Sequence, residues 1–415
     1  MKDFRHLSWG AALLSAALIF SPVFGARVLP AQSSRSAAAG AYSVLYSFQC
    51  EPDGANPAAG LVRDSAGNLY GTTYNGGVKS FGSVFKVTPN GTEALLYSFS
   101  THIRDAENPA LANLILDRKG NLYGTTPVGG LSDSGAVFKV TADGKDTLLD
   151  SFTANGDGNE PIGGLVADSA GNAYGTAAYG GSLGSGVVFK LSPAGVETVL
   201  YNFGSQGSGD GANPIGTMVR DSVGNLYGTT ENGGALGFGT VFKLAPDGAE
   251  TTLHSFAGFP NDGGFPGGTT LLRDPAGNLY GTTVYGGAYD DPTGFGYGVV
   301  FKVAPSGTES VLLNFNGRGN GGYPQDGLAR DGSGNFYGTA EVGGSTSCVD
   351  NSSGCGVLFE LNSNGKETVL YKFGESFSDG EDPVGGVIRD SAGNLYGTTY
   401  GGGDSGCGTV FKYTP

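Results

Sequence analysis

After residue 41 the chain alternates short apolar or aromatic runs with clusters of Gly, Pro, Asn and Ser, and no helical period interrupts this pattern. In the first unit the runs cover residues 61–64, 69–74, 83–88 and 93–99. A Gly pair ends the second run, and a Pro-Asn-Gly turn separates the third run from the fourth. Short β-branched and aromatic runs bounded by turn residues are typical of β-strands. Each unit therefore predicts four antiparallel strands, which we name a to d.

The same unit occurs seven times along the chain. Each copy has Tyr-Gly-Thr in strand b, one Phe in strand c and another Phe at the end of strand d. Its anchor, D-x-x-G-N, starts at Asp64, Asp117, Asp168, Asp221, Asp274, Asp331 and Asp390. We expect this Asp to cap the hairpin between strands a and b, since Asp readily accepts bonds from nearby backbone N–H groups. Four-stranded units repeated in this way predict an all-β, seven-bladed β-propeller.

The two ends of the chain predict how the ring closes. The last copy stops after strand c, at residues 408–415, whereas an additional strand d, residues 42–48, precedes the first copy. Seven complete blades therefore require the N-terminal strand to join the last blade. This closure removes the unpaired sheet edges that the alternative, an open solenoid, would leave at both ends.

The four cysteines, Cys50, Cys348, Cys355 and Cys407, support the same closure. An even number of cysteines in an exported protein suggests two disulfides. Cys50 follows the closing strand d and Cys407 precedes strand c of the same blade, so we predict a Cys50–Cys407 bond. Cys348 and Cys355 would then close a small loop in the sixth blade. The alternatives are four free thiols in a reducing compartment and a zinc site, which the spacing does not favour.

The N-terminal 31 residues are expected to form an export signal. Lys2 and Arg5 precede an apolar run over residues 7–24, and small residues then offer cleavage sites. An uncleaved membrane anchor is the alternative, which Pro22 and the modest apolar length disfavour. Residues 32–41 are expected to form a flexible leader and residues 42–415 the propeller. We therefore expect a secreted protein in the periplasm, at the cell surface or outside the cell, with no membrane insertion after cleavage.

Composition narrows the classes of partner. The chain has 415 residues, 77 of them Gly, and 38 Asp and Glu against 23 Lys and Arg, which gives a net charge of −15. A hydrophobic content of 39% suffices for a folded core. An acidic chain does not neutralise phosphates, so nucleic acid is not expected as a partner. We expect a monomer.

The connections from strand d to the next strand a hold a second motif, D-G-x-x-P or a near variant. Its Asp column is Asp53, Asp105, Asp157, Asp210, Asp262 and Asp379, with Asn320 in the remaining copy. By strand parity these loops share a face with the b–c loops, which carry Tyr74, Tyr179, Tyr285 and Tyr400. This acidic and aromatic face is the predicted binding site, for Ca²⁺, a sugar or a cationic peptide. The alternative is that each Asp only forms an Asx-turn ahead of Pro.

Two b–c loops are longer than the others and break the symmetry of the ring. Their insertions lie around residues 289–294 and 346–354. Because seven equivalent loops cannot by themselves make a single specific site, we expect a site for one ligand to lie beside these insertions.

The unit G-N-L-Y-G-T-T-x-x-G-G, followed by G-T-V-F-K-L-x-P-x-G and L-Y-x-F, resembles the GloVer tandem repeat of exported bacterial proteins. Residues 224–230, 239–244 and 393–414 follow it closely, and the resemblance covers nearly the whole chain after residue 41. The D-x-x-G-N start is also similar to that of NHL-type propellers. The resemblance implies export and a tandem-repeat architecture; it implies no activity and no catalytic residues. Members typically carry a C-terminal sorting anchor, a pattern from which this chain departs.

Motifs for catalysis are missing from the sequence. It contains no nucleophile elbow, H-E-x-x-H, Walker loop or dinucleotide fingerprint. His254 stands in a strand d position that is Tyr in four other copies, and we expect it to pack in the core. The leading hypothesis is therefore an exported, non-enzymatic binding or surface-interaction module for a glycan or protein ligand, without a cofactor. The alternatives are a carbohydrate-active enzyme that uses loop carboxylates and a calcium-stabilised structural module.

Overall fold

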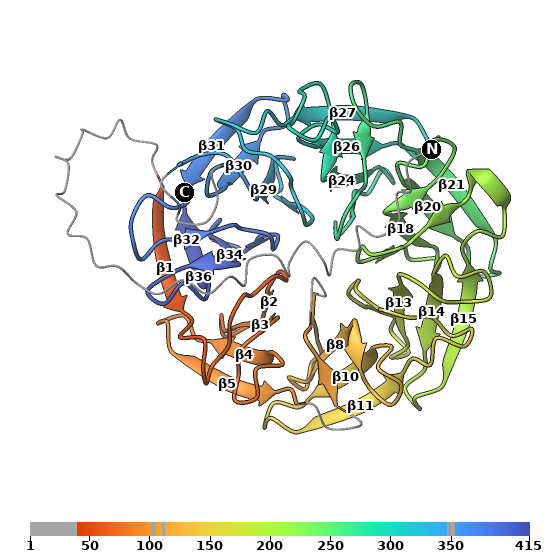
Figure 1. Ribbon diagram of the computed structural model, residues 1–415, viewed down its shortest axis with the longest axis horizontal. Helices are drawn as coiled ribbons and strands as arrows, with labels where there is room; N and C mark the ends of the chain where they lie inside the picture. Colours follow the sequence, from red (N-terminus) through yellow and green to blue (C-terminus); the bar gives the residue numbers. More distant parts are fainter. Residues whose placement is uncertain (1–39, 101–104, 110–112, 347, 349–352) are drawn as a thin grey trace. The chain divides into compact units, whose positions relative to one another are not determined.

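Seven four-stranded antiparallel sheets surround a central axis as the blades of a propeller (Figure 1). The computed structural model describes residues 40–415 except 101–104, 110–112, 347 and 349–352. The expected export signal and most of the expected leader lie outside the described residues. The predicted all-β, seven-bladed fold is confirmed. No helix among the described residues is long and apolar enough to cross a membrane.

Each of the first four blades takes its strands in chain order from the axis outward. Blade 1 contains β2 (Val62–Arg63), β3 (Leu69–Thr73), β4 (Ser83–Val87) and β5 (Glu93–Ser98). Blade 2 contains β7 (Ile115–Leu116), β8 (Leu122–Thr126), β10 (Ala136–Val140) and β11 (Asp146–Ser151). Blade 3 contains β12 (Val166–Ala167), β13 (Ala173–Ala177), β14 (Val187–Leu191) and β15 (Glu197–Asn202). Blade 4 contains β17 (Val219–Arg220), β18 (Leu226–Thr230), β20 (Thr240–Leu244) and β21 (Glu250–Ser255).

The remaining blades repeat this arrangement, except that the last one combines the two ends of the chain. Blade 5 contains β23 (Leu272–Arg273), β24 (Leu279–Thr283), β26 (Val299–Val303) and β27 (Glu309–Asn314). Blade 6 contains β28 (Ala329–Arg330), β29 (Phe336–Ala340), β30 (Val357–Leu361) and β31 (Glu367–Lys372). Blade 7 contains β33 (Ile388–Arg389), β34 (Leu395–Thr399), β36 (Thr409–Thr414) and, as its outer strand, β1 (Ala41–Ser47).

The pairing of β1 with β36 closes the ring as predicted. The ladder runs from Ala41 opposite Thr414 to Ser47 opposite Thr409, and Figure 1 shows β1 at the red end of the colour scale beside β36 at the blue end. Both predicted disulfides are present: Cys50 is bonded to Cys407 and Cys348 to Cys355. The first and last strands are thus joined by backbone hydrogen bonds and by a covalent link.

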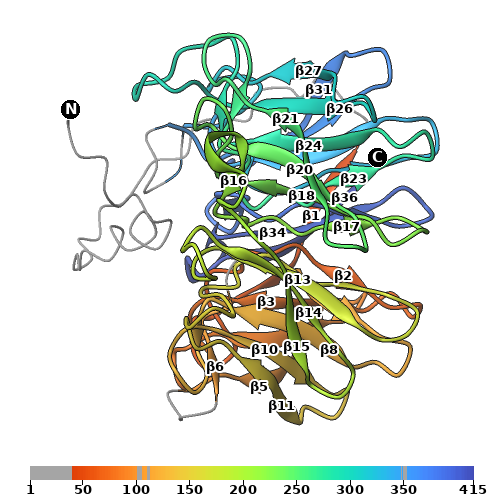
Figure 2. The ribbon, with the colours of Figure 1, turned by 90° about the vertical axis from the view of Figure 1, so that its right-hand side faces the viewer.

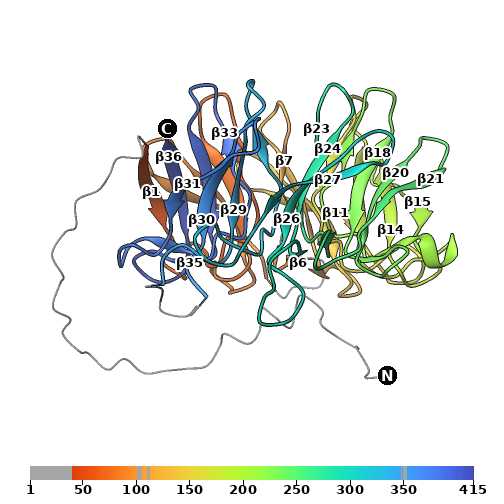
Figure 3. The same ribbon diagram turned by 90° about the horizontal axis from the view of Figure 1, so that it is seen from above.

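The two faces of the ring differ in what they carry. Strands a and c end in short hairpin turns on one face, which we call the turn face. The d–a and b–c loops form the other, which we call the loop face, and there they pair in short ladders such as β6 (Ala106–Glu107) with β9 (Val128–Gly129). The other ladders of this kind are β16 (Gly211–Ala212) with β19 (Asn232–Gly233), β22 (Gly263–Gly264) with β25 (Tyr285–Gly286), and β32 (Gly380–Glu381) with β35 (Gly401–Gly402). In Figures 2 and 3, β6, β16 and β35 lie towards one face and β7, β17, β23 and β33 towards the other.

The two Phe columns form the contact between neighbouring blades. Phe256 at the end of β21 meets the ring of Phe301 in β26 of the next blade edge to face, with an interplanar angle of 67° and centroids 5.1 Å apart. The same edge-to-face pair occurs at all seven interfaces, including Phe48 with Phe85 across the closure and Phe373 with Phe411. These rings are almost completely buried. Such a geometry suits the quadrupoles of the two rings and adds to the hydrophobic stabilisation of each interface.

The Gly of Tyr-Gly-Thr is required by this packing. A Cβ on Gly281 would lie 2.7 Å from Cζ of Phe301 and 3.0 Å from Cδ2 of Leu271. The equivalent glycines of the other blades approach their Phe rings just as closely. Only a residue without a side chain lets the strand c Phe lie against strand b.

The Asp of the D-x-x-G-N motif connects the a–b hairpin to the Tyr of strand b. Asp221 accepts bonds from the backbone and side-chain N–H groups of Asn225 and from the hydroxyl of Tyr227. Burial raises the pKa of this Asp, but the hydrogen bonds outweigh burial and lower it below its ordinary value. The Arg preceding the motif lies over the Tyr ring of the neighbouring blade, as with Arg273 over Tyr227 at 5.3 Å. The expectation that Asp caps its hairpin is confirmed.

We predict that Gly281→Ala lowers the stability of the ring by about 1–3 kcal/mol, because the added methyl group overpacks the contact with Phe301. Urea denaturation followed by fluorescence measures the change. Gly332→Ala is the matched control, since a Cβ there meets no atom within 4 Å, and it should shift stability by less than about 0.5 kcal/mol. Equal effects of the two substitutions would contradict the packing role of Gly281.

Candidate functional site

The Asp column of the d–a loops is held in place by its own loop. Asp210 accepts bonds from the backbone N–H groups of Gly204, Gln206 and Gly211 and from the hydroxyl of Tyr201 on strand d. Asp53, Asp105 and Asp379 likewise accept bonds from loop N–H groups and from the strand d Tyr. Asp157 accepts the N–H and hydroxyl of Thr153. These carboxylates therefore serve separate blade interfaces and do not converge on one site; their role in ligand binding stays a prediction.

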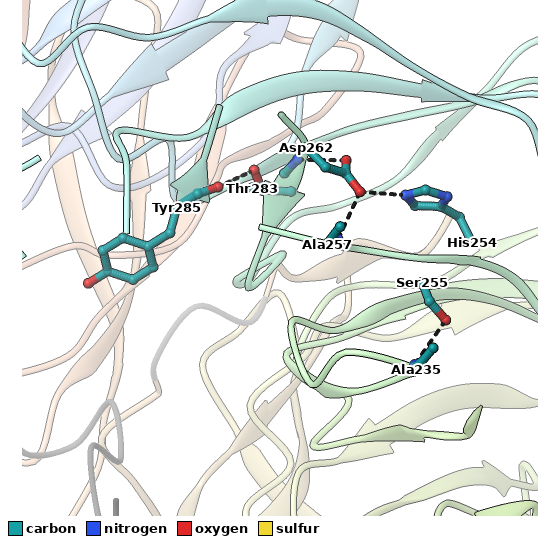
Figure 4. A network of polar contacts seen from close by, with 8 residues as sticks. Ala235, His254, Ser255, Ala257, Asp262, Thr283 and Tyr285 are labelled. Carbon is teal, nitrogen blue, oxygen red and sulfur yellow. Dashed lines mark hydrogen bonds and ion pairs between the residues drawn. The ribbon is translucent and has the colours of Figure 1, made fainter. Parts of the chain in front are cut away.

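Asp262 differs from the rest of the column in its strand d partner. Here His254 replaces Tyr, and its Nε2 lies 3.2 Å from Oδ2 of Asp262. The same oxygen accepts the N–H of Ala257 at 2.8 Å (Figure 4). The His254 ring stands edge-on to Phe256, at 4.8 Å between centroids. His254 therefore packs on the core, as expected, and also makes a polar contact that the repeat pattern did not reveal.

Six of the seven blade interfaces also bring a second acidic side chain towards this column, from the start of the next strand d, and the interface of blades 6 and 7 has Tyr42 there. Burial, followed by the nearby charge of Asp53, raises the pKa of Glu93 to about 7. Burial and a neighbouring Asp do the same for Asp146, Glu197 and Glu250. Because these shifts repeat around the ring, they are a property of blade packing and do not single out one catalytic acid.

The residue before each loop Pro lies in the left-handed region of backbone space, with φ between 50° and 58° in all seven copies. In three of them it is Asn, and its side-chain amide donates to a carbonyl of the preceding blade: Asn56 to Tyr400, Asn108 to Tyr74 and Asn213 to Ala178. Asn tolerates this conformation, whereas a bulky residue does so only at a cost. Phe265 occupies this position in the d–a loop that leads into blade 5, and Tyr323 occupies it in the loop that leads into blade 6.

These two strained residues belong to an aromatic cluster at blades 4 to 6. Neighbouring ring centroids in this cluster are 5.4 to 6.0 Å apart. Its members are Phe238, Phe265, Tyr285, Phe295, Tyr297 and Tyr323. Of the predicted binding residues, only Tyr285 lies in it; Tyr74 and Tyr400 lie near one another on blades 1 and 7, and Tyr179 lies on blade 3. Tyr285 is shown beside Thr283 and the His254–Asp262 contact in Figure 4.

Asp291 fixes the expanded loop that carries half of this cluster. It accepts bonds from the N–H groups of Phe295 and Gly296 and from the hydroxyls of Thr293 and Tyr323. Burial acts to raise its pKa, but these donors prevail and lower it. The second expanded loop lies largely outside the described residues. The sequence could have suggested the cluster only through the two aromatic residues before Pro, where the other copies have Asn, Asp or Glu.

The loop face combines exposed apolar side chains with acidic ones. Seven of the nine exposed large hydrophobic residues described lie there: Val78, Leu131, Leu183, Leu236, Tyr289, Phe295 and Phe377. Only Val196 and Val223 lie on the turn face. Among the described residues of the d–a and b–c loops, Lys79 and Arg318 are the basic ones, whereas acidic residues occur in all seven d–a connections.

Polar groups of opposite blades meet across the axis at the start of strand a. The amide of Asn113 in blade 2 donates to Thr270 in blade 5 at 2.9 Å, and Thr270 donates to Asp326 in blade 6 at 3.1 Å. Asp326 also accepts the N–H of Gly386 in blade 7. A cavity of about 800 Å³ lies along the axis beyond this layer, lined by β2, β7, β12 and β33 and including Arg63 and Arg389. None of the predicted binding residues lines it.

A family model of the Gloeobacter/Verrucomicrobia repeat matches residues 34–221 and 205–411 of the chain. No curated protein matches it in sequence. Among solved structures, an extracellular domain assigned to a one-component system of B. thetaiotaomicron is similar, with a TM-score of 0.54 and 10% identity over 89% of this chain. The chain spans 39% of that structure. A gluconolactonase from Xanthomonas campestris is similar at a TM-score of 0.45 and 14% identity, over 91% of this chain and 90% of its own. At these identities the likeness to the first structure supports the fold alone.

The raised pKa of the acidic residues at the start of strand d leads us to predict that the stability of the fold falls as pH rises. Glu93 is protonated in the folded state up to a pKa of about 7, above its ordinary value near 4.3 in an unfolded chain. The stabilisation is therefore complete below about pH 4 and is lost as pH rises through 7. Glu93→Gln mimics the protonated acid. At pH 8 it should raise the melting temperature and add up to about 1 kcal/mol to the free energy of unfolding, a value reduced by solvent screening. At pH 5 it should change either quantity little.

Asp404→Asn, at an exposed loop position, is the control and should give the same small effect at both pH values. Differential scanning calorimetry measures both variants. A Glu93→Gln effect that does not depend on pH would rule out the proposed proton linkage.

Proposed function

The chain belongs to the Gloeobacter/Verrucomicrobia repeat family, and we propose that it is an exported, non-enzymatic binding module whose loop face takes a cationic, partly apolar polypeptide. Two disulfides support an oxidising compartment. A rigid ring that presents many loops on one face is an arrangement in which binding residues usually lie on those loops.

The distribution of exposed apolar side chains carries this proposal. Leu131, Leu183 and Leu236 lie one or two residues after the Gly pair in the b–c loops of blades 2 to 4, each more than half exposed. Exposing such residues to water without a partner is unfavourable. Their concentration on one face, where seven of the nine described lie, supports an interaction surface there. Tyr289 and Phe295 extend the set into the aromatic cluster of blade 5.

The negative charge of the loop face favours a positively charged partner. The whole chain carries −15, and its loop-face connections hold Asp and Glu with few basic residues among them. An acidic surface attracts a basic partner at long range and repels acidic ones. A polypeptide with alternating basic and apolar side chains satisfies both features, whereas a neutral glycan would leave the aliphatic side chains without matching contacts.

The alternative of a carbohydrate-active enzyme has less support. Carboxyls with a raised pKa recur at successive blade interfaces, which points to packing. Asp291, the acid fixed beside the aromatic cluster, has both oxygens occupied by donors. Such a carboxylate is poorly placed to accept a proton from a substrate.

The proposal predicts that basic amphipathic peptides bind the purified protein and that binding depends on the loop face. The triple variant Leu131→Ser, Leu183→Ser, Leu236→Ser should weaken binding at least tenfold, because it removes the apolar contacts. Raising the salt concentration from 50 mM to 500 mM should weaken it too, because surface charges are screened. Fluorescence anisotropy with labelled peptides measures both effects.

The double variant Val196→Ser, Val223→Ser is the matched control, since both residues are exposed on the turn face. It should bind as the wild type does. A glycan array on the same preparations supplies the opposing test. Saturable binding to glycans alone, or peptide binding that the triple variant leaves unchanged, would overturn the proposal.

A further inference from the structure

We propose that His254, Asp262 and Glu309 form a site for one divalent transition-metal ion between blades 4 and 5. This inference is independent of the partner of the loop face. His254 lies in β21 of blade 4, Asp262 in the loop that leads to blade 5, and Glu309 at the start of β27 in blade 5. An ion held by all three would link two neighbouring blades near their outer strands.

The ligand atoms are already close together. One ring nitrogen of His254 and one carboxylate oxygen each of Asp262 and Glu309 lie within 4.8 Å of one another. Among the described residues, one group of three or more His, Cys, Asp or Glu side chains has its ligand atoms this close together, and it is this group. Nε2 of His254 and Oδ2 of Asp262 are 3.2 Å apart, which leaves room for both to turn towards a shared ion at the usual 2.0–2.2 Å.

The surroundings fix these side chains without using all their lone pairs. The N–H groups of Ala257 and Gly263 hold the carboxylate of Asp262, and the edge-on contact with Phe256 orients the imidazole of His254. Oε1 of Glu309 is shielded from solvent and accepts no hydrogen bond, as is also true of the equivalent oxygens of Glu93, Glu197 and Glu367 at their interfaces. A buried carboxylate oxygen without a donor is costly unless a proton or a cation compensates it. The His254 and Asp262 side chains stay 19% and 14% exposed, so an ion can reach them from solvent.

The other six interfaces show what is particular about this one. Four of them have Tyr in place of His254, and its hydroxyl donates a hydrogen bond to the carboxylate. The equivalent sets are Tyr46, Asp53 and Glu93; Tyr97, Asp105 and Asp146; Asp150, Asp157 and Glu197; Tyr201, Asp210 and Glu250; Leu313, Asn320 and Glu367; and Tyr371, Asp379 and Tyr42. Only the set at blades 4 and 5 offers a nitrogen ligand. The ring has thus kept the acidic pair and exchanged a hydrogen-bond donor for a metal ligand at a single interface.

The ligand types select the class of ion. One imidazole and two carboxylates suit Zn²⁺, Mn²⁺, Co²⁺ and related first-row ions, whereas Ca²⁺ prefers six to eight oxygen ligands. Three protein ligands leave one or more coordination positions of the ion open to water. Neutral imidazole and ionised carboxylates are the forms that bind, so the ion competes with protons at the site.

The test uses the full chain purified without a polyhistidine tag and the ions Zn²⁺, Co²⁺ and Ca²⁺ as separate probes. Isothermal titration calorimetry should give one Zn²⁺ or Co²⁺ per chain, with Ca²⁺ at least tenfold weaker. His254→Tyr restores the residue of four sister blades, so the variant should fold as the wild type does. It should bind Zn²⁺ at least tenfold more weakly, and Zn²⁺ should raise the melting temperature of the wild type alone.

Glu309→Gln gives a second, independent arm, because it keeps the size of the side chain and removes the charge. It too should weaken Zn²⁺ binding at least tenfold. Circular dichroism and metal-free melting curves establish that both variants are folded. Undetectable Zn²⁺ binding to the wild type, equal binding by His254→Tyr, or stronger binding of Ca²⁺ than of Zn²⁺ would each overturn the proposal.

Discussion

The closure of the ring by β1 and β36 is the constraint on which the rest of the structure depends. Each blade buries its strand c Phe against the strand d Phe of the preceding blade, so a blade is complete only when it has a neighbour on both sides. At the junction the neighbour is supplied by the N-terminal strand: Phe48 covers Phe85. Without β1 the seventh sheet would lose its outer strand and the first blade would expose its aromatic core to water.

Closure also explains how a nearly symmetric scaffold acquires distinct sites. Because the Phe pairs, the glycine of Tyr-Gly-Thr and the D-x-x-G-N cap repeat in every blade, the loops can differ without altering the ring. The aromatic residues Phe265 and Tyr323 before Pro and the insertion around Asp291 build an aromatic cluster on one side of the loop face. A single exchange of Tyr for His254 alters one interface of seven. The features that distinguish one blade from another are therefore departures from the repeat.

The sequence predicts the parts of the structure that repeat and misses those that depend on neighbours across blades. The period, the strand count at each end and the positions of Cys50 and Cys407 were enough for the fold, the closure and both disulfides, because each follows from strand order alone. The Asp column was recognised, but its bonds to Tyr201 and its equivalents depend on how strand d turns into the loop. His254 looked like a core residue because its column is aromatic. Its approach to Glu309, 55 positions further on, arises only when two blades stack.

The most direct test of the closed ring is tryptic mapping of the non-reduced protein by mass spectrometry. Cys50 lies in the segment 36–63 and Cys407 in the segment 390–412, whereas Cys348 and Cys355 share the segment 331–366. A closed ring predicts that 36–63 and 390–412 appear as one cross-linked species, which separates on reduction, and that 331–366 carries an internal disulfide. Free thiols at Cys50 and Cys407, or a link from either of them to 331–366, would contradict the closure.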